Sequence, residues 1–128
     1  MSAASLRARY LGDTVTTASP ERLLVMLYDR LALDLERAER ALQDKDRAEA
    51  GEQLGHAQEI VLELLASLQV DVWEGGPRLA ALYNWLLSEM TAANLKGDVG
   101  RISSCRLVVE PLRDAWHQAA ASLAANAS

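Results

Sequence analysis

Apolar residues with helical spacing dominate the stretch that follows Ser19 and Pro20. Successive members of the pattern are four or three residues apart, which places them along one face of a helix. They are Leu24, Tyr28, Leu31, Leu35, Ala38 and Leu42. Ser19 is a favourable N-cap residue, and Pro20 suits the first helical position because its missing N–H would have no partner there. The pattern predicts a long helix over residues 20–43 that turns one stripe toward a core.

The same spacing recurs in three later segments, for which we predict helices over residues 46–69, 77–96 and 98–123. The three stripes are Ala50, Leu54, Ala57, Val61, Leu64 and Leu68; Leu79, Leu82, Leu86, Met90 and Ala93; and Ile102, Cys105, Val109, Leu112, Trp116, Ala119 and Leu123. Polar or glycine-containing segments separate them, and no alternating strand pattern occurs. The sequence therefore predicts an all-α fold, an antiparallel up-down four-helix bundle in one domain over residues 1–128, with a flexible arm over residues 1–18.

Two features of the predicted helices call for a local explanation. Gly51 and Gly55 lie one turn apart, where they either permit the close approach of a neighbour or are tolerated weak points. Pro111 lies inside the last helix, where it removes a hydrogen bond to the carbonyl of Leu107. We expect it to kink or locally open that helix.

Composition excludes several classes of partner. The net charge of -5 argues against nucleic acid, which requires a basic surface. No apolar run approaches the length of a membrane span, and the first residues lack the apolar core of a signal peptide. The single cysteine fits a reducing compartment. We expect a soluble cytoplasmic protein with no stable membrane insertion.

Catalytic and metal-binding patterns are missing from the sequence. His56 and His117 lie well away from the apolar stripes, and neither is part of a Glu-x-x-His pair, so we expect no metal site and no cofactor. Cys105 falls on a core stripe without a histidine placed to activate it. We predict that the chain is not an enzyme. An exposed histidine on the second helix of a bundle also occurs in histidine phosphotransfer domains, but the residues after His56 differ from theirs.

Apolar residues outside the four stripes are in surplus. They are Leu23, Val25, Met26, Leu27, Ile60, Leu62, Leu65, Tyr83, Trp85, Leu87, Leu95, Leu107 and Val108. Some of them widen the core, because bundle helices often bury three residues per heptad. Together they suggest an apolar groove that receives an amphipathic helix or the protein's own arm, in which Tyr10 is an aromatic residue able to fill it. A homodimer interface is the alternative use of such a patch.

Several short motifs resemble those of one protein family. Tyr10 is followed by Val15-Thr16-Thr17-Ala18-Ser19-Pro20 and then by Met26-Leu27-Tyr28-Asp29. Ala57-Gln58-Glu59-Ile60-Val61, Gly75-Gly76, Leu82-Tyr83, Ala93-Asn94 and Trp116 continue the pattern in order. Over nearly its whole length the chain resembles the flagellar export chaperones of the FliS family.

The resemblance implies a four-helix bundle that binds the disordered C-terminal segment of newly made flagellin in the cytoplasm. It also implies that the chaperone prevents premature polymerisation and delivers flagellin for export, where the flagellar export gate is a further partner. The implied flagellin-binding residues are Tyr10, Leu11, Val15, Leu23, Leu27, Tyr28, Tyr83 and Asn94. Two residues depart from the family pattern: Arg30 replaces a frequent glycine and is expected near the mouth of the groove, and Pro111 interrupts the last helix. A homodimeric interaction module and a histidine phosphotransfer domain remain the alternative functions.

Overall fold

Four helices make up the ordered framework of the computed structural model, which describes residues 20–68 and 74–127. They are α2 (Pro20–Gln43), α3 (Arg47–Ser67), α4 (Gly76–Lys96) and α5 (Val99–Ala127). The predicted arm lies outside the described residues. None of the described helices is both apolar enough and long enough to cross a bilayer.

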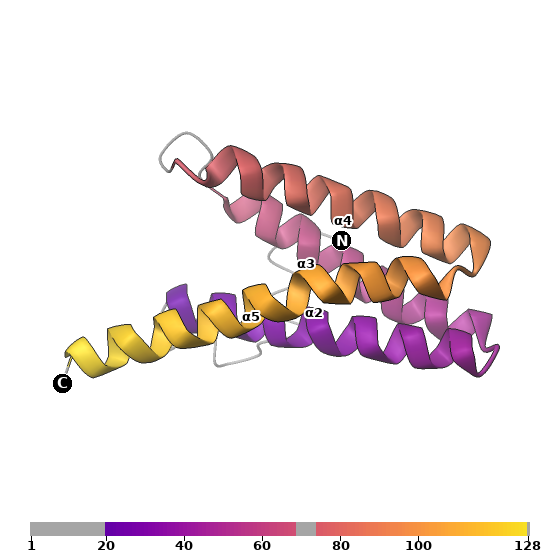
Figure 1. Ribbon diagram of the computed structural model, residues 1–128, viewed down its shortest axis with the longest axis horizontal. Helices are drawn as coiled ribbons and strands as arrows, with labels where there is room; N and C mark the ends of the chain where they lie inside the picture. The colour runs from indigo at the N-terminus through magenta and orange to yellow at the C-terminus, as the bar shows by residue number, and fades with distance from the viewer. Residues whose placement is uncertain (1–19, 69–73, 128) are drawn as a thin grey trace.

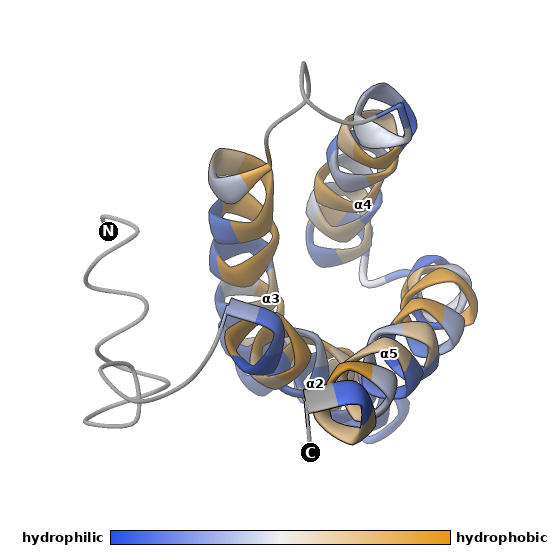
Figure 2. Ribbon diagram, turned by 90° about the vertical axis from the view of Figure 1, so that its left-hand side faces the viewer, coloured by the Kyte–Doolittle hydropathy of each residue, from blue (hydrophilic) through white to orange (hydrophobic). Residues whose placement is uncertain are grey.

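The helices form a bundle in which successive helices run in opposite directions (Figure 1). α2 packs against α3 and α5, and α4 packs against the same two helices from the opposite corner (Figure 2). Their more hydrophobic faces are turned toward the interior. The predicted all-α, up-down four-helix bundle is confirmed. Each helix has two neighbours, and the most extensive packing is that of α2 against α3 and α5.

Short turns at one end of the bundle fix the order of the helices. In the turn after α2, Asp46 is the N-cap of α3, and its carboxylate accepts a hydrogen bond of 3.1 Å from the backbone N–H of Glu49. In the turn after α4, Gly97 adopts a left-handed conformation with φ of 64°, and its N–H bonds to the carbonyl of Ala93. Glycine is favoured there because other residues are strained at positive φ.

Arg47 links the two turns by hydrogen bonds. Its guanidinium donates hydrogen bonds of 2.9 Å and 3.3 Å to the carbonyl oxygens of Asn94 and Leu95, at the C-terminal end of α4. A Cβ atom at Gly97 would lie 2.7 Å from the Nη1 atom of Arg47. Gly97 therefore provides both the backbone conformation and the space that this contact requires. The two glycines of α3 differ: a Cβ atom at Gly51 would lie 3.2 Å from the Asn94 side chain, whereas Gly55 has open space.

The core contains most of the predicted stripes and three residues predicted to lie outside them. Leu27, Ile60 and Tyr83 lie outside the predicted stripes but are buried, so they are among the surplus residues that widen the core. The reason is geometric, since each helix has neighbours on two flanks and buries a broader face than a narrow stripe. Leu123 is 52% exposed although its spacing placed it in the core. Figure 1 shows the last turns of α5 extending beyond the start of α2, where no helix covers them.

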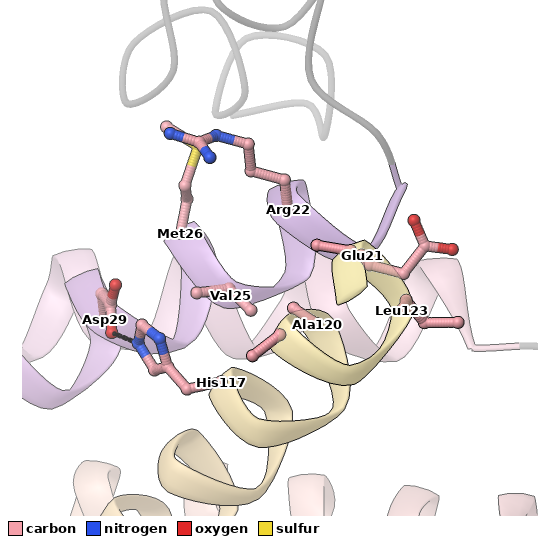
Figure 3. Close-up of a pocket in the computed structure, with 10 residues that line it drawn as sticks. Glu21, Arg22, Val25, Met26, Asp29, His117, Ala120 and Leu123 are labelled. Atoms are coloured by element: carbon pink, nitrogen blue, oxygen red, sulfur yellow. Dashed lines mark hydrogen bonds and ion pairs between the residues drawn. The ribbon is translucent and has the colours of Figure 1, made fainter. Parts of the chain in front are cut away.

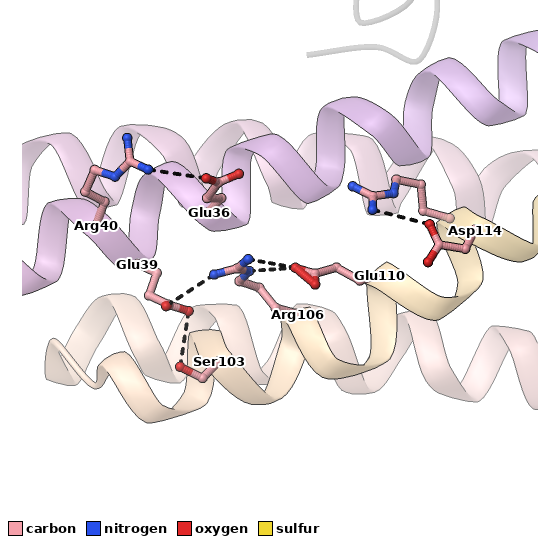
Figure 4. A network of polar contacts seen from close by, with 8 residues as sticks. Glu36, Glu39, Arg40, Ser103, Arg106, Glu110 and Asp114 are labelled. Atoms are coloured by element: carbon pink, nitrogen blue, oxygen red, sulfur yellow. Dashed lines mark hydrogen bonds and ion pairs between the residues drawn. The ribbon is translucent and has the colours of Figure 1, made fainter. Parts of the chain in front are cut away.

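Polar contacts around Glu39 join α2 to α5 (Figure 4). Arg106 on α5 forms ion pairs of 3.2 Å with Glu39 of α2 and 2.7 Å with Glu110 of its own helix. The hydroxyl of Ser103 donates a hydrogen bond of 3.2 Å to the second carboxylate oxygen of Glu39. Pro111 is exposed, and helix α5 continues through it, so the expected local opening of the helix does not occur.

Candidate functional site

A pocket lies between the first turns of α2 and the last turns of α5 (Figure 3). Its volume is about 750 Å³. The side chains that line it come from these two helices: Glu21, Arg22, Val25, Met26 and Asp29 from α2, and Ala120, Ala121, Leu123, Ala124 and His117 from α5. A space of this size falls in the range of pockets that bind ligands or anchor side chains of a partner.

Small residues on α5 leave this space open. Facing the half-buried Val25 and Met26 of α2, the last turns of α5 contribute mainly alanines to the wall. Figure 3 shows Val25 directed toward α5, next to Ala120. Alanine side chains end at Cβ, so they cannot fill the distance between two helix axes, which is typically 8–10 Å. The apolar floor of the pocket therefore remains accessible.

An exposed polar pair closes one end of the pocket. The Nε2 atom of His117 on α5 lies 2.6 Å from the Oδ1 atom of Asp29 on α2, and both side chains are about half exposed, at 49% and 47%. Figure 3 shows this contact bridging the two helices beside Val25. The opposite part of the rim carries Glu21 and Arg22. The pocket thus has an apolar floor with charged groups of both signs at its edge, which suits an amphipathic segment.

A second titratable group, buried away from the pocket, lies in α2. Asp34 has no exposed surface, and its Oδ1 atom is 3.0 Å from the Nε atom of Arg30. Burial raises the pKa of the Asp34 carboxyl to about 6, and the nearby positive charges of Arg30 and His56 partly oppose that rise. Arg30 therefore pairs with a buried carboxylate and is not among the residues that line the pocket.

The predicted site residues are distributed over different environments. Leu23 is half-buried on α2, and Asn94 is exposed on α4. Leu27, Tyr28 and Tyr83 are buried in the core. The remaining three predictions, Tyr10, Leu11 and Val15, lie outside the described residues. Within the described part of the chain, the structure does not bring the predicted set together in one open groove.

Sequence reasoning found some of the pocket and missed the rest. Val25 and Met26 were recognised as apolar residues in surplus, and both line the pocket. The spacing places Leu123 in the core, and it gives no role to Ala120, Ala121 and Ala124, which line the pocket. The signal that could have indicated the pocket is side-chain volume. After Trp116 the apolar residues of the sequence are alanines and Leu123, and their side chains are too small to fill a groove against α2. Among residues 20–68 and 74–127, no group of His, Cys, Asp and Glu has the arrangement of a metal site.

Comparison with known proteins places this fold in a family. The family model of the flagellar protein FliS matches residues 2–123. The chain belongs to the FliS family of flagellar secretion chaperones.

Relatives in the FliS family are similar over most of their length. The flagellar secretion chaperone FliS of Bacillus subtilis is 32% identical over 110 residues, which cover 86% of this chain and 82% of the relative. The FliS chaperone of Escherichia coli is 30% identical over 108 residues, covering 83% and 79%. A solved structure described as a flagellar chaperone from bacteria has the same fold, with a TM-score of 0.73 at 21% identity, and covers 93% of this chain and 98% of its own.

The motif Met26-Leu27-Tyr28-Asp29, which carries much of the resemblance to FliS proteins, faces two environments. Met26 and Asp29 line the pocket, whereas Leu27 and Tyr28 lie in the core. Successive helical residues are about 100° apart, so four consecutive residues necessarily cover more than one face. One short motif therefore contributes both to the stability of α2 and to the wall of the pocket.

Proposed function

We propose that this chain is a cytoplasmic export chaperone that binds the disordered C-terminal segment of flagellin. An apolar side of the client segment lies in the pocket between α2 and α5 and becomes helical there. Bound in this way, flagellin is prevented from polymerising before export and is carried to the flagellar export gate. Membership in the FliS family supports a flagellar client.

The open apolar pocket is the observation that carries the proposal. Val25, Met26 and Leu123 give it apolar surface, which releases free energy when a client covers it. A segment that folds on binding gives up part of that free energy as ordering entropy, commonly 2–5 kcal/mol. Such binding is reversible, as a chaperone that later releases its client requires. Leu23 lies close to the pocket residues in sequence, and its contact with the client is part of the proposal.

Three residues of the predicted site are buried in the free bundle, so the proposal does not depend on their contact with the client. Leu27, Tyr28 and Tyr83 are part of the core in the free bundle. Their direct contact with a client, like that of Tyr10, Leu11, Val15 and Asn94, stays a prediction.

Titration with a peptide of the last ~40 residues of flagellin from the same organism tests the proposal, with calorimetry as the measurement. Substitution Ala121→Trp fills the pocket and is expected to weaken binding at least tenfold. Ala48→Trp is the matched control, because Ala48 is also an exposed helical alanine but lies on α3. Thermal unfolding followed by circular dichroism shows whether both variants remain folded.

Three results would contradict the proposal in different ways. Absence of peptide binding by the unmodified chain would refute the flagellin-chaperone function. Equal weakening by both tryptophan variants, or by neither, would leave flagellin binding in place but refute the pocket as its site. A stable dimer in light scattering that binds no flagellin peptide would favour the homodimeric module.

A further inference from the structure

The outer face of α4 carries no charged residue over more than three turns. Its exposed residues between Arg78 and Lys96 are Ala81, Asn84, Trp85, Ser88, Thr91, Asn94 and Leu95, which we call the α4 face. The exposed residues of α2 include Glu21, Arg22, Asp29, Glu36, Arg37 and Arg40. Removing the α4 face from water therefore costs no desolvation of a charge, unlike the corresponding face of α2.

Two large apolar side chains project from the α4 face. Trp85 is 38% exposed and Leu95 is 77% exposed. Tryptophan is enriched among the residues that contribute most to binding at protein interfaces. Single exposed apolar residues are common on soluble proteins, but here two of them share a face without charges.

Both flanks of α4 form polar contacts with neighbouring helices, and on the side of α3 these contacts include residues at the edge of the α4 face itself. On the side of α3, the amide of Gln58 donates a hydrogen bond of 3.0 Å to the hydroxyl of Thr91. On the side of α5, Arg101 forms an ion pair of 3.0 Å with Glu89. Figure 1 shows α4 at the margin of the bundle, and in Figure 2 none of the other labelled helices lies outside it. The α4 face shares no residue with the pocket between α2 and α5.

A positively charged side chain lies at each end of the α4 face. Arg78 and Lys96 are exposed, and neither forms an ion pair with another residue of the described segments. At 1.5 Å per residue they lie about 27 Å apart along the helix axis. Positive charges at both ends of an uncharged face are notable in a chain with a net charge of -5. Their complement is a partner with negative charges about five helical turns apart.

We propose that the α4 face binds an amphipathic helix of a second protein, one with small and aliphatic residues along its contact face and acidic residues near both ends. Trp85 and Leu95 contact its aliphatic residues, and Arg78 and Lys96 pair with its acidic ends. The proposal goes beyond client binding in the pocket, because this partner binds a separate surface and both occupy the chaperone at once.

The charges of Arg78 and Lys96 also disfavour binding of a second copy of this chain to the α4 face. If two α4 helices pair in opposite directions, Arg78 of one copy faces Lys96 of the other. If they pair in the same direction, each cation faces its own counterpart. Both arrangements bring like charges together without an acidic partner on the face, which disfavours self-association.

A designed peptide provides the test, with binding to the full chain measured by calorimetry and by NMR chemical-shift mapping. The acidic probe is a 20-residue helical peptide with leucine and alanine along one face and paired glutamates at both ends. The matched probe has lysines in place of those glutamates. We expect the acidic probe to bind at least tenfold more tightly than the lysine probe, equally well with and without saturating flagellin peptide, and to shift the resonances of α4.

Variants locate the binding surface. The double substitution Arg78→Glu and Lys96→Glu is expected to weaken binding of the acidic probe at least tenfold, and Trp85→Ala at least fivefold. Arg37→Glu, a charge reversal on the exposed side of α2, serves as the control and is expected to leave binding unchanged. Equal affinity for the two probes, or equal effects of the α4 and α2 reversals, would overturn the proposal.

Two further measurements examine other occupants of the α4 face. Binding to vesicles of phosphatidylcholine and phosphatidylglycerol that is lost in the Arg78→Glu and Lys96→Glu variant would assign the face to an anionic lipid surface and refute a protein partner. A dimeric mass in light scattering that becomes monomeric with Trp85→Ala would assign it to a second copy and likewise refute the proposal. We expect no vesicle binding and a monomeric mass.

Discussion

The hydroxyl groups of Tyr28 on α2 and Tyr83 on α4 lie 2.7 Å apart inside the bundle. Both side chains are buried, and the ring of Tyr28 packs against Trp116 of α5 with 6.2 Å between ring centroids. Burial raises the pKa of both phenols, so both remain neutral at physiological pH. One hydrogen bond between neutral groups therefore links the two helices that lie at opposite corners of the bundle.

Removing one of these hydroxyl groups is expected to cost more than removing both. Tyr83→Phe leaves the hydroxyl of Tyr28 buried without its partner, so we expect the free energy of unfolding to fall by about 1–2 kcal/mol. Tyr28→Phe is expected to have the same effect, because it leaves the hydroxyl of Tyr83 without its partner. In the double variant no orphaned hydroxyl remains, and the loss is expected to be smaller than either single loss. Urea unfolding of the four proteins measures these values, and strictly additive losses would show that the two hydroxyl groups are not coupled.

Leu27 is expected to act as a core residue. It is 5% exposed, so Leu27→Ala leaves a cavity and should lower the free energy of unfolding by about 2–4 kcal/mol. Leu62 on α3 is 52% exposed and provides the control, for which Leu62→Ala should change stability by less than about 0.5 kcal/mol. Midpoints of urea unfolding compare the two variants. Similar small losses of stability in both variants would show that Leu27 is not a core residue.

Asp34 is expected to make stability depend on pH. Its pKa is about 6 in the folded protein, above the ordinary value of 3.8, so the folded state binds the proton more strongly than the unfolded state. Its contribution to stability is therefore most favourable below the unfolded pKa and is lost as the pH rises through the folded pKa. Between pH 4 and pH 7, we expect Asp34→Asn to gain stability relative to the unmodified chain by roughly 2–3 kcal/mol.

The measurement for Asp34 is the free energy of unfolding in urea at several pH values. Only the change of the difference with pH matters, because the substitution also alters the pairing with Arg30 at every pH. Asp44→Asn, in the exposed turn after α2, is the matched control and should show no comparable trend. A difference that stays constant from pH 4 to pH 7 would contradict a raised pKa of Asp34.

Helix periodicity predicted the architecture because each stripe reports a repeated local geometry. Residues such as Leu31, Leu54, Met90 and Ile102 are buried where their spacing placed them. Spacing cannot report how wide a buried face is, since that depends on how many neighbours a helix has. Tyr83 shows the difference, because it lies next to the predicted Leu82 and is the more buried of the two.

The pocket was harder to predict than the fold because it depends on side chains that are too small to fill it. Hydrophobic patterns identify residues that favour burial, such as Val25, but they do not measure the space between two helices. Ala120 and Ala121 acquire a role only when α5 is placed against α2. The hydrogen bond between Asp29 and His117 joins residues far apart in the chain, and no local motif indicates it.

The contact of Arg47 with the end of α4 has a mechanical consequence for the bundle. It fastens the hairpin of α2 and α3 to the hairpin of α4 and α5 at the end where both short turns lie (Figure 1). A helix of 21 residues is about 31 Å long, so a rotation of about 3° around that fastened end displaces the far end by roughly 1.6 Å. The pocket lies at the far end. A pivot of this size would change the width of the pocket opening while leaving the hydrogen bonds of Arg47 at the fastened end intact.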